Sequence, residues 1–269
     1  MINMRIRMKT NLLTDALQRV LMKGKYYNGN SNAKNSVLEE YASLALATPN
    51  AVVNVQSDET YLKVMSGNAT TVCSIAVPIE QALSWEGRPV TVDIKQMLVF
   101  LKRFKKDGDM EFHEDDGKVV LSQGSKTATV PIFLNHPHPA SVERARALRY
   151  HTPDEEYVFG KTTYPSHFLM LSDILREALA GCESVDNARY RFEVTNNETL
   201  EVSSAMGATT FSASTQGRLV GDELATVEVT GPTISFFGSV PLHLYMLDDR
   251  PLVMATHDSV LVKAPFIVE

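Results

Sequence analysis

The clearest chemical signal in the sequence is a group of cations in the segment 94–106. Its spacing predicts a helix, and at about 100° per residue such a helix has two contrasting faces. The cationic face carries Lys95, Lys102, Arg103 and Lys106, and the apolar face carries Met97, Leu101 and Phe104. A helix of this kind can pack on a sheet and present its charge to phosphate groups. The same stripe is also typical of a solvated helix face, so the residues alone leave both interpretations open.

Three further cations could add charge from neighbouring helices. Arg19 and Lys23 lie in a helix predicted over 11–23, and Arg176 lies in a helix predicted over 173–182. Each of them is equally an ordinary surface residue by type. Phosphate contacts fix position without reading bases, so a surface built from these cations would suit nucleic acid of any sequence.

The sequence contains few residues that could form a metal site, a disulfide framework or a catalytic site. His136 and His138 form a His-x-His pair without a nearby third ligand, which is less than a metal site needs. Cys73 and Cys182 are too few for a disulfide framework, and we expect both to be buried and reduced. There is no glycine-rich phosphate loop and no nucleophile elbow. The sequence therefore predicts no metal, no cofactor and no enzymatic activity.

The sequence around these cations contains an internal repeat. The stretch 55–71, VQSDETYLKVMSGNATT, returns 139 positions later at 194–210 as VTNNETLEVSSAMGATT. A second pair follows in the same order, with Asp115-Asp116 answered by Asp248-Asp249 and Pro131-Ile132-Phe133 answered by Pro265-Phe266-Ile267. Two blocks in one order with nearly constant spacing indicate a duplicated domain. Chance similarity between β-rich segments is the alternative.

Hydrophobic periodicity predicts an α+β protein in which two helices pack on antiparallel strands in each copy. For the first copy we expect helices at 11–23 and 94–106, and strands at 4–9, 38–47, 51–56, 60–65, 70–77, 90–93, 109–114, 118–122 and 126–132. For the second we expect helices at 173–182 and 232–239, and strands at 167–171, 189–195, 199–204, 208–214, 225–229, 241–247, 251–256 and 259–268. The predicted domains are 1–134 and 165–269, joined by a connector over 135–164.

Composition is typical of a soluble, cytoplasmic globular protein, with 44% hydrophobic and 22% charged residues. No apolar run approaches the ~20 residues of a membrane span, and the basic start MINMRIRMKT leads into an amphipathic segment, so we expect no signal peptide. Charge is uneven. Residues 1–134 hold 16 Lys/Arg against 14 Asp/Glu, whereas 135–269 hold 10 against 18. Phosphates respond to local basic surface, so the acidic second half does not exclude DNA binding.

Two stretches resemble a known family. Residues 90–133, VTVDIKQMLVFLKRFKKDGDMEFHEDDGKVVLSQGSKTATVPIF, resemble the second half of a DNA sliding-clamp domain. Residues 242–269, LHLYMLDDRPLVMATHDSVLVKAPFIVE, are similar to the C-terminal end of the archaeal and eukaryotic clamp PCNA, including Pro-Leu after an acidic turn and a closing Ala-Pro. The pattern covers most of the chain and is closer to a divergent phage-type or plasmid-type clamp. Unlike a DNA-facing clamp helix, 230–240 lacks cations.

The resemblance implies a polymerase processivity factor that encircles double-stranded DNA, served by a clamp loader. A clamp ring holds six such domains, so a two-domain chain implies a homotrimer. It also implies a groove in which DNA polymerase and other clients insert short hydrophobic peptides, and the matching positions are Leu62, Leu148, Pro251, Val262, Ala264 and Pro265. Ordinary strand packing would explain several of these residues equally well. Two rival functions remain open, namely a monomeric clamp-like factor that touches DNA from one side and a duplicated β-rich virion-type protein without DNA affinity.

Overall fold

A computed structural model describes residues 4–21, 50–55, 60–67, 70–85, 90–133, 139–185, 189–230 and 236–266. Several sequence predictions lie outside these ranges: Lys23, the loop at 26–35, the strand at 38–47, His136 and His138. The described chain divides into two compact units. The first ends at Arg146, and the second comprises 70–73 and the residues from Ala147 onward. The domain limits predicted at residues 134 and 164 stay predictions.

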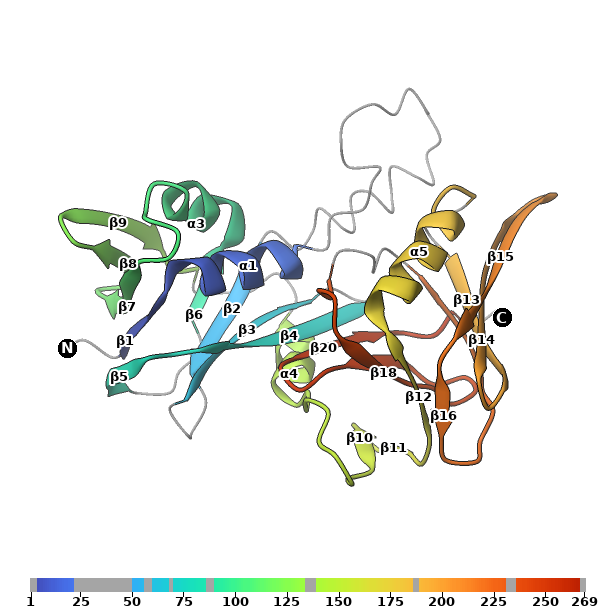
Figure 1. Ribbon diagram of the computed structural model, residues 1–269. Helices are drawn as coiled ribbons and strands as arrows, with labels where there is room; N and C mark the ends of the chain where they lie inside the picture. The colour runs from blue at the N-terminus through green and yellow to red at the C-terminus, as the bar shows by residue number, and fades with distance from the viewer. Residues whose placement is uncertain are drawn as a thin grey trace. The chain divides into compact units, whose positions relative to one another are not determined.

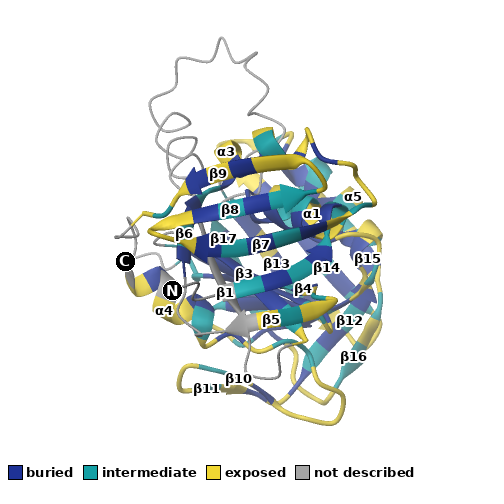
Figure 2. Cartoon of the chain, turned by 90° about the vertical axis from the view of Figure 1, so that its left-hand side faces the viewer, coloured by how far each residue is buried: buried dark blue, intermediate teal, exposed yellow. Residues whose placement is uncertain are grey.

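One sheet of the first unit has the strand order β5-β1-β7-β8-β9. Its strands are β1 (Met4–Lys9), β5 (Gln81–Trp85), β7 (Asp109–Asp115), β8 (Lys118–Gln123) and β9 (Lys126–Pro131). Figure 2 shows this sheet face on, with buried residues alternating with partly buried ones along β8 and with exposed ones along β9. The alternation arises because successive side chains of a strand point to opposite faces. β9 and β5 form the two edges of the sheet.

Two helices of the first unit, α1 (Thr10–Val20) and α3 (Ile94–Leu101), lie side by side (Figure 1). Both bury the residues that their helical spacing predicts, including Leu13 and Leu17 of α1 and Met97 and Leu101 of α3. The unit also contains paired strands in the order β6-β2-β3-β4, followed by a helix. Their bounds are β2 (Asn50–Val55), β3 (Tyr61–Gly67), β4 (Thr71–Pro78), β6 (Val90–Asp93) and α4 (Pro139–Arg146).

The second unit repeats this plan. A four-stranded sheet in the order β15-β14-β13-β17 packs against helix α5 (Ser172–Cys182). Its strands are β13 (Arg189–Asn196), β14 (Thr199–Met206), β15 (Thr209–Gln216) and β17 (Thr226–Thr230). Further strands pair in the order β16-β12-β18-β19-β20, and a hairpin joins β10 to β11. They are β10 (Tyr157–Phe159), β11 (Thr162–Tyr164), β12 (His167–Leu171), β16 (Arg218–Val220), β18 (Pro241–Tyr245), β19 (Leu252–Ala255) and β20 (Ser259–Lys263).

The repeat found in the sequence coincides with equivalent hairpins. The block at 55–71 runs from the end of β2 into β4, and its partner at 194–210 runs from β13 into β15. Asp116 and Asp249 both adopt positive φ, 43° and 58°, in the turns before β8 and β19. The amide of Phe133 donates to Thr91 at 2.8 Å, and the amide of Phe266 donates to Glu228 at 2.7 Å. The duplicated α+β architecture is therefore confirmed.

Four predictions about elements were wrong or incomplete. The segment 94–106 is helical only to Leu101. The described part of the predicted helix at 232–239 is not helical, because its main chain bonds to α5 instead: Phe237 accepts from Arg176, and Val240 donates to Ser172. The connector carries α4 and the β10–β11 hairpin, and β5 and β16 were not predicted. Among the described residues, no helix is long and apolar enough to cross a membrane.

Candidate nucleic-acid interface and client groove

The cationic segment is half helix and half loop. Asp93 caps α3 by accepting the amide of Gln96 at 2.9 Å, and the first turn exposes Lys95. After Leu101 the chain continues in turns, in which the amides of Arg103 and Phe104 donate to carbonyls three residues back. The prediction that Lys102, Arg103 and Lys106 lie on one face of this helix was therefore wrong, because these residues lie beyond its end.

The loop that follows α3 is held by its neighbours. The amide of Lys105 donates to Gln123 Oε1 at 2.5 Å, and Gln123 Nε2 donates to the Lys105 carbonyl at 3.1 Å. The carbonyl of Lys106 accepts the amide of Asn11, the first turn of α1, at 2.9 Å. These bonds use the main-chain groups that a longer helix would need, which explains why α3 stops. They also leave the loop few free main-chain groups, so we expect it to be rigid.

The loop and the start of α3 together form the cationic loop surface, which comprises the exposed residues Lys95, Lys102, Arg103, Lys105 and Lys106. Lys126 of β9 extends it, donating to the Arg103 carbonyl at 2.6 Å. Asp107 is the acidic residue nearest to these cations in the sequence, and the side-chain amide of Asn11 donates to its carboxylate at 3.3 Å. Helical periodicity missed Lys105 and Lys126, because Lys105 lies off the predicted face and Lys126 follows a separate turn.

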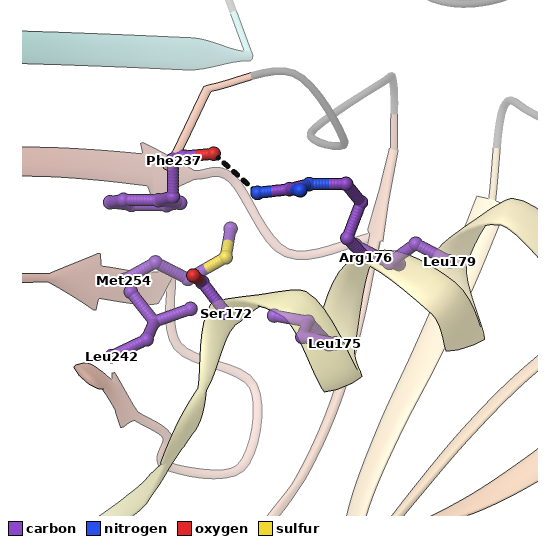
Figure 3. Close-up of a pocket in the computed structure, with 7 residues that line it drawn as sticks. All are labelled: Ser172, Leu175, Arg176, Leu179, Phe237, Leu242 and Met254. Carbon is purple, nitrogen blue, oxygen red and sulfur yellow. Dashed lines mark hydrogen bonds between the residues drawn. The ribbon is translucent and has the colours of Figure 1, made fainter. Parts of the chain in front are cut away.

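Arg19 and Arg176, the other predicted cations that the structure describes, have structural partners. Arg19 lies 3.5 Å from Asp15 one helical turn away, and only 17% of its side chain is exposed. Arg176 pairs with Asp173 at 2.8 Å. It also donates to the Phe237 carbonyl at 2.9 Å, as Figure 3 shows. Each is consistent with an ordinary structural role, and a role of either in DNA binding stays a prediction.

Arg176 also borders a small apolar cavity between α5 and the sheet, drawn in Figure 3. The cavity is lined by Ser172, Leu175, Arg176, Leu179, Phe237, Leu242 and Met254. Its volume of about 10 Å³ is close to the minimum that one water molecule needs. An aromatic or aliphatic anchor of a peptide would not enter it without repacking, so it is not a candidate client site.

The residues predicted to line the client groove differ in how far they are buried. Leu62 lies in β3 of the first unit and is fully buried, and Leu148 and Val262 of the second unit are almost fully buried. Pro251, Ala264 and Pro265 are half-buried. Ala264 donates its amide to the Thr70 carbonyl at 2.7 Å, so the start of β4 lies beside the end of β20 within the second unit. The half-buried prolines and alanine are the part of the set that a client peptide could reach, and the role of the set stays a prediction.

Two tyrosines fix the main chain beside residues of the predicted groove. Tyr157 donates its hydroxyl to the Arg149 carbonyl at 2.8 Å, directly after Leu148. Tyr164 donates to the Pro251 carbonyl at 2.7 Å. The amide of His151 adds a bond of 2.8 Å to Thr256 at the end of β19. Neither tyrosine was singled out in the sequence, since nothing in its pattern distinguishes an anchoring tyrosine from a core one.

Metal and thiol sites have little basis in the described chain. Within the described ranges no three His, Cys, Asp or Glu side chains are placed to hold a metal ion. Cys73 and Cys182 are both buried thiols, as expected. Burial raises the pKa of Cys182 to about 11, which disfavours the nucleophilic thiolate.

Comparison with known proteins gives a likeness of structure but none of sequence. No protein-family model matches the chain, and no curated protein matches its sequence. Among solved structures it is similar to PCNA of A. fulgidus, solved with the C-terminal region of FEN-1, with a TM-score of 0.66 at 13% identity over 99% of each chain. A putative DNA polymerase III beta subunit of Eubacterium rectale gives 0.70 at 11% identity, over 100% of this chain and 67% of that one.

A third similar structure is the Helicobacter pylori beta clamp bound to a DNA ligase peptide. It gives a TM-score of 0.63 at 12% identity, over 99% of this chain and 67% of that one. The chain therefore spans the length of a PCNA chain and about two thirds of the bacterial beta clamps. At these identities the likeness establishes architecture, and it does so over the whole chain. The chain has the duplicated-domain fold of the DNA sliding clamps.

Proposed function

We propose that this chain is the subunit of a DNA sliding clamp, a processivity factor without enzymatic activity that holds a DNA polymerase on duplex DNA. The observation that carries the proposal is the clamp fold over the entire chain, joined to the exposed cationic loop surface. Neutralising phosphates with lysine and arginine gives affinity for DNA of any sequence, as sliding requires. This task would place the protein at replication sites in the cytoplasm.

Ring closure would use the free sheet edges. β9 is an edge of the five-stranded sheet in the first unit, and β15 is an edge of the four-stranded sheet in the second. A strand edge exposes unpaired main-chain groups that favour pairing with another chain. Pairing β9 of one chain with β15 of the next, three times over, gives a homotrimer of six domains. Such a closed ring needs a clamp loader or spontaneous opening to admit DNA.

Clients would bind by inserting short hydrophobic peptides near Pro251, Ala264 and Pro265. The support comes from two similar structures, PCNA with the C-terminal region of FEN-1 and the beta clamp with a DNA ligase peptide. Half-buried small and apolar residues suit an aliphatic or aromatic anchor. The polymerase and the other clients are identified only by this chemistry.

A second candidate is a monomeric factor that binds polymerase and touches DNA from one side. The exposed side of α5 favours it, because Asp173 and Glu177 lie there and Arg176 is paired with Asp173. The second unit would then add little positive charge to a ring interior.

Native mass spectrometry across a concentration series separates the two candidates. A species near three times 29.8 kDa supports the ring. A monomer that persists at high concentration contradicts it and makes the one-sided factor the better account. Fluorescence anisotropy with a short duplex then tests DNA binding, and an absence of binding at low salt would contradict both candidates.

A further inference from the structure

Six aromatic side chains of the second unit form one group, which we term the histidine–tyrosine cluster. They come from the stretch before β10, from the β10–β11 hairpin, from β12 and from β18. The members are His151, Tyr157, Tyr164, His167, His243 and Tyr245. The proposed function gives its histidines no role, and three of the seven histidines of the chain gather here.

The histidines of the cluster are in direct ring contact. His151 stacks on His243 with ring centroids 3.5 Å apart and an angle of 14° between the planes. His167 lies 4.8 Å from His243 and 5.9 Å from His151. His151 Nδ1 is 2.6 Å from the hydroxyl of Tyr245, while His243 Nδ1 is buried and has no hydrogen-bond partner among the described residues. Rings at these distances pack well only while they carry little charge.

The tyrosines connect the cluster to the candidate client groove. Tyr157 stacks on Tyr245 at 4.5 Å and bonds to the carbonyl of Arg149, next to Leu148. Tyr164 packs edge-on against Tyr245 at 6.3 Å and bonds to the carbonyl of Pro251. The main chain at Leu148 and at Pro251 is therefore held by the same cluster that contains the stacked histidines.

We propose that the histidine–tyrosine cluster is a proton-sensitive clasp, which fixes the main chain at 148–151 and at Pro251 while its histidines are neutral and releases it when they are protonated. The link from the clasp to client binding rests on the proposed function, because Leu148 and Pro251 border the groove only in that account. The clasp itself rests on the geometry of the cluster alone.

Protonation opposes this geometry for three reasons. Two stacked imidazolium rings 3.5 Å apart would repel each other. In the tautomer whose Nδ1 carries no proton, Nδ1 of His151 accepts from the Tyr245 hydroxyl, and protonation would reverse this bond and leave the hydroxyl hydrogen to find another acceptor. His243 Nδ1 would become a buried donor without an acceptor.

In the part of the chain that the structure describes, the arginines that act electrostatically on the cluster offer no compensation. Arg218 of β16 acts on His167, Arg149 acts on Tyr157, and Arg250 acts on Tyr164. All three are cations, so a protonated histidine gains no opposite charge from them.

Burial, with help from the neighbouring histidines, lowers the pKa of His167 and of His243 to about 4, and burial also lowers the pKa of His151. An ordinary histidine titrates near 6.5. Because the folded pKa lies below the unfolded one, the unfolded or released form binds more protons between these values. The clasp is therefore fully closed above pH ~6.5 and weakens as the pH falls toward ~4.

Hydrogen exchange tests the clasp with neither client nor DNA present. Amide exchange is measured by mass spectrometry near pH ~7.5 and pH ~5, corrected for the intrinsic pH dependence. We expect the amides of 148–151 to exchange at least ~10-fold faster in acid, while Leu200 and Val202 of β14 stay protected as an internal reference. His243→Phe keeps a ring in the stack but cannot be protonated, so it should abolish most of the acid response. Tyr245→Phe should loosen 148–151 already at the higher pH.

His257→Gln is the matched control, because the His257 side chain is 81% exposed and outside the cluster. It should respond to acid like the unmodified chain. An acid response that is absent, or equally large in His243→Phe, overturns the proposal. If His243→Phe does not fold, His167→Phe takes its place with the same expectation. A monomer in the mass measurement would remove the ring but leave this result standing, so the two proposals fail separately.

Discussion

The side chain of Gln123, at the end of β8, bonds to both main-chain groups of Lys105. Its Oε1 accepts the Lys105 amide at 2.5 Å, and its Nε2 donates to the Lys105 carbonyl at 3.1 Å and to Thr10 Oγ1 at 3.1 Å. The side-chain amide of Gln123 thus satisfies both the N–H and the carbonyl of Lys105, as a neighbouring strand would in a sheet. The bonds hold the loop that carries most of the cationic loop surface, so Gln123 is its positioning residue.

Gln123→Ala should free the loop and weaken the first unit. Three hydrogen bonds are lost, and the Lys105 main chain must find water, for a loss of about 1–3 kcal/mol in the free energy of unfolding. Urea denaturation measures the loss, and hydrogen exchange at 105–108 should rise with it. Gln96→Ala, at an exposed position of α3, is the control and should change little. Equal stability of the two variants would show that Gln123 does not hold the loop.

Removing the loop cations should weaken DNA binding and flatten its salt dependence. A variant with Lys102, Arg103, Lys105 and Lys106 all changed to alanine loses four exposed charges. If each contacts a phosphate, the slope of log K against log salt concentration falls by about 3 to 4 for each subunit that contacts the DNA. Fluorescence anisotropy with a short duplex across a salt series measures the slope.

The control for this variant removes the same charge elsewhere. Arg149, Lys161, Arg218 and Arg250 are exposed cations of the second unit, and all four can be changed to alanine. This control should shift the affinity only slightly and keep the slope. The same change of slope in both variants would mean that net charge, rather than the cationic loop surface, governs binding.

The sequence was a good guide to the fold where local patterns decide the structure. The repeat at 55–71 and 194–210 marks equivalent hairpins. The acidic pairs Asp115-Asp116 and Asp248-Asp249 lie at turns, and the second aspartate of each pair has positive φ. Asp and Asn tolerate this left-handed conformation better than most residues, so composition alone signals such turns. Alternation and helical spacing likewise placed β6, β7 and most of α1.

Prediction from the sequence failed where residues far apart in the chain determine the local structure. The cations after Leu101 keep helical spacing, but Gln123 and Asn11, which end the helix by bonding to its main chain, come from β8 and α1. The histidine–tyrosine cluster gathers residues from 151 to 245, which no local pattern connects. Long-range hydrogen bonds and ring contacts of this kind override local propensity.

Lys63 should make the stability of the first unit depend on pH in the alkaline range. It is buried in β3 and donates to the carbonyl of Arg146, at the end of α4, at 3.1 Å. Burial lowers its pKa to about 8 from an ordinary 10.5. The unfolded chain therefore binds more protons between these values, and stability rises as the pH rises through them.

Lys63→Met tests this dependence, because it keeps the length of the side chain and removes the titrating group. Urea denaturation near pH ~7.5 and pH ~9.5 should show a gain for the unmodified chain that the variant lacks. The difference between the two proteins cancels the contributions of all other groups. An identical gain in both would show that Lys63 does not titrate in this range.

Gly217 should be intolerant of a side chain, in contrast to Gly238. It connects β15 to β16, and a Cβ there would lie 2.3 Å from the ring of buried Phe168 and 2.6 Å from the carbonyl oxygen of Leu169. The carbonyl belongs to β12 and cannot move without disturbing its pairing with β16. Gly217→Ala should therefore cost about 1–3 kcal/mol in the free energy of unfolding. Gly238→Ala, with no atom within 4 Å of the added carbon, should be nearly neutral in the same urea titration, and equal losses would contradict the packing described for β12 and β16.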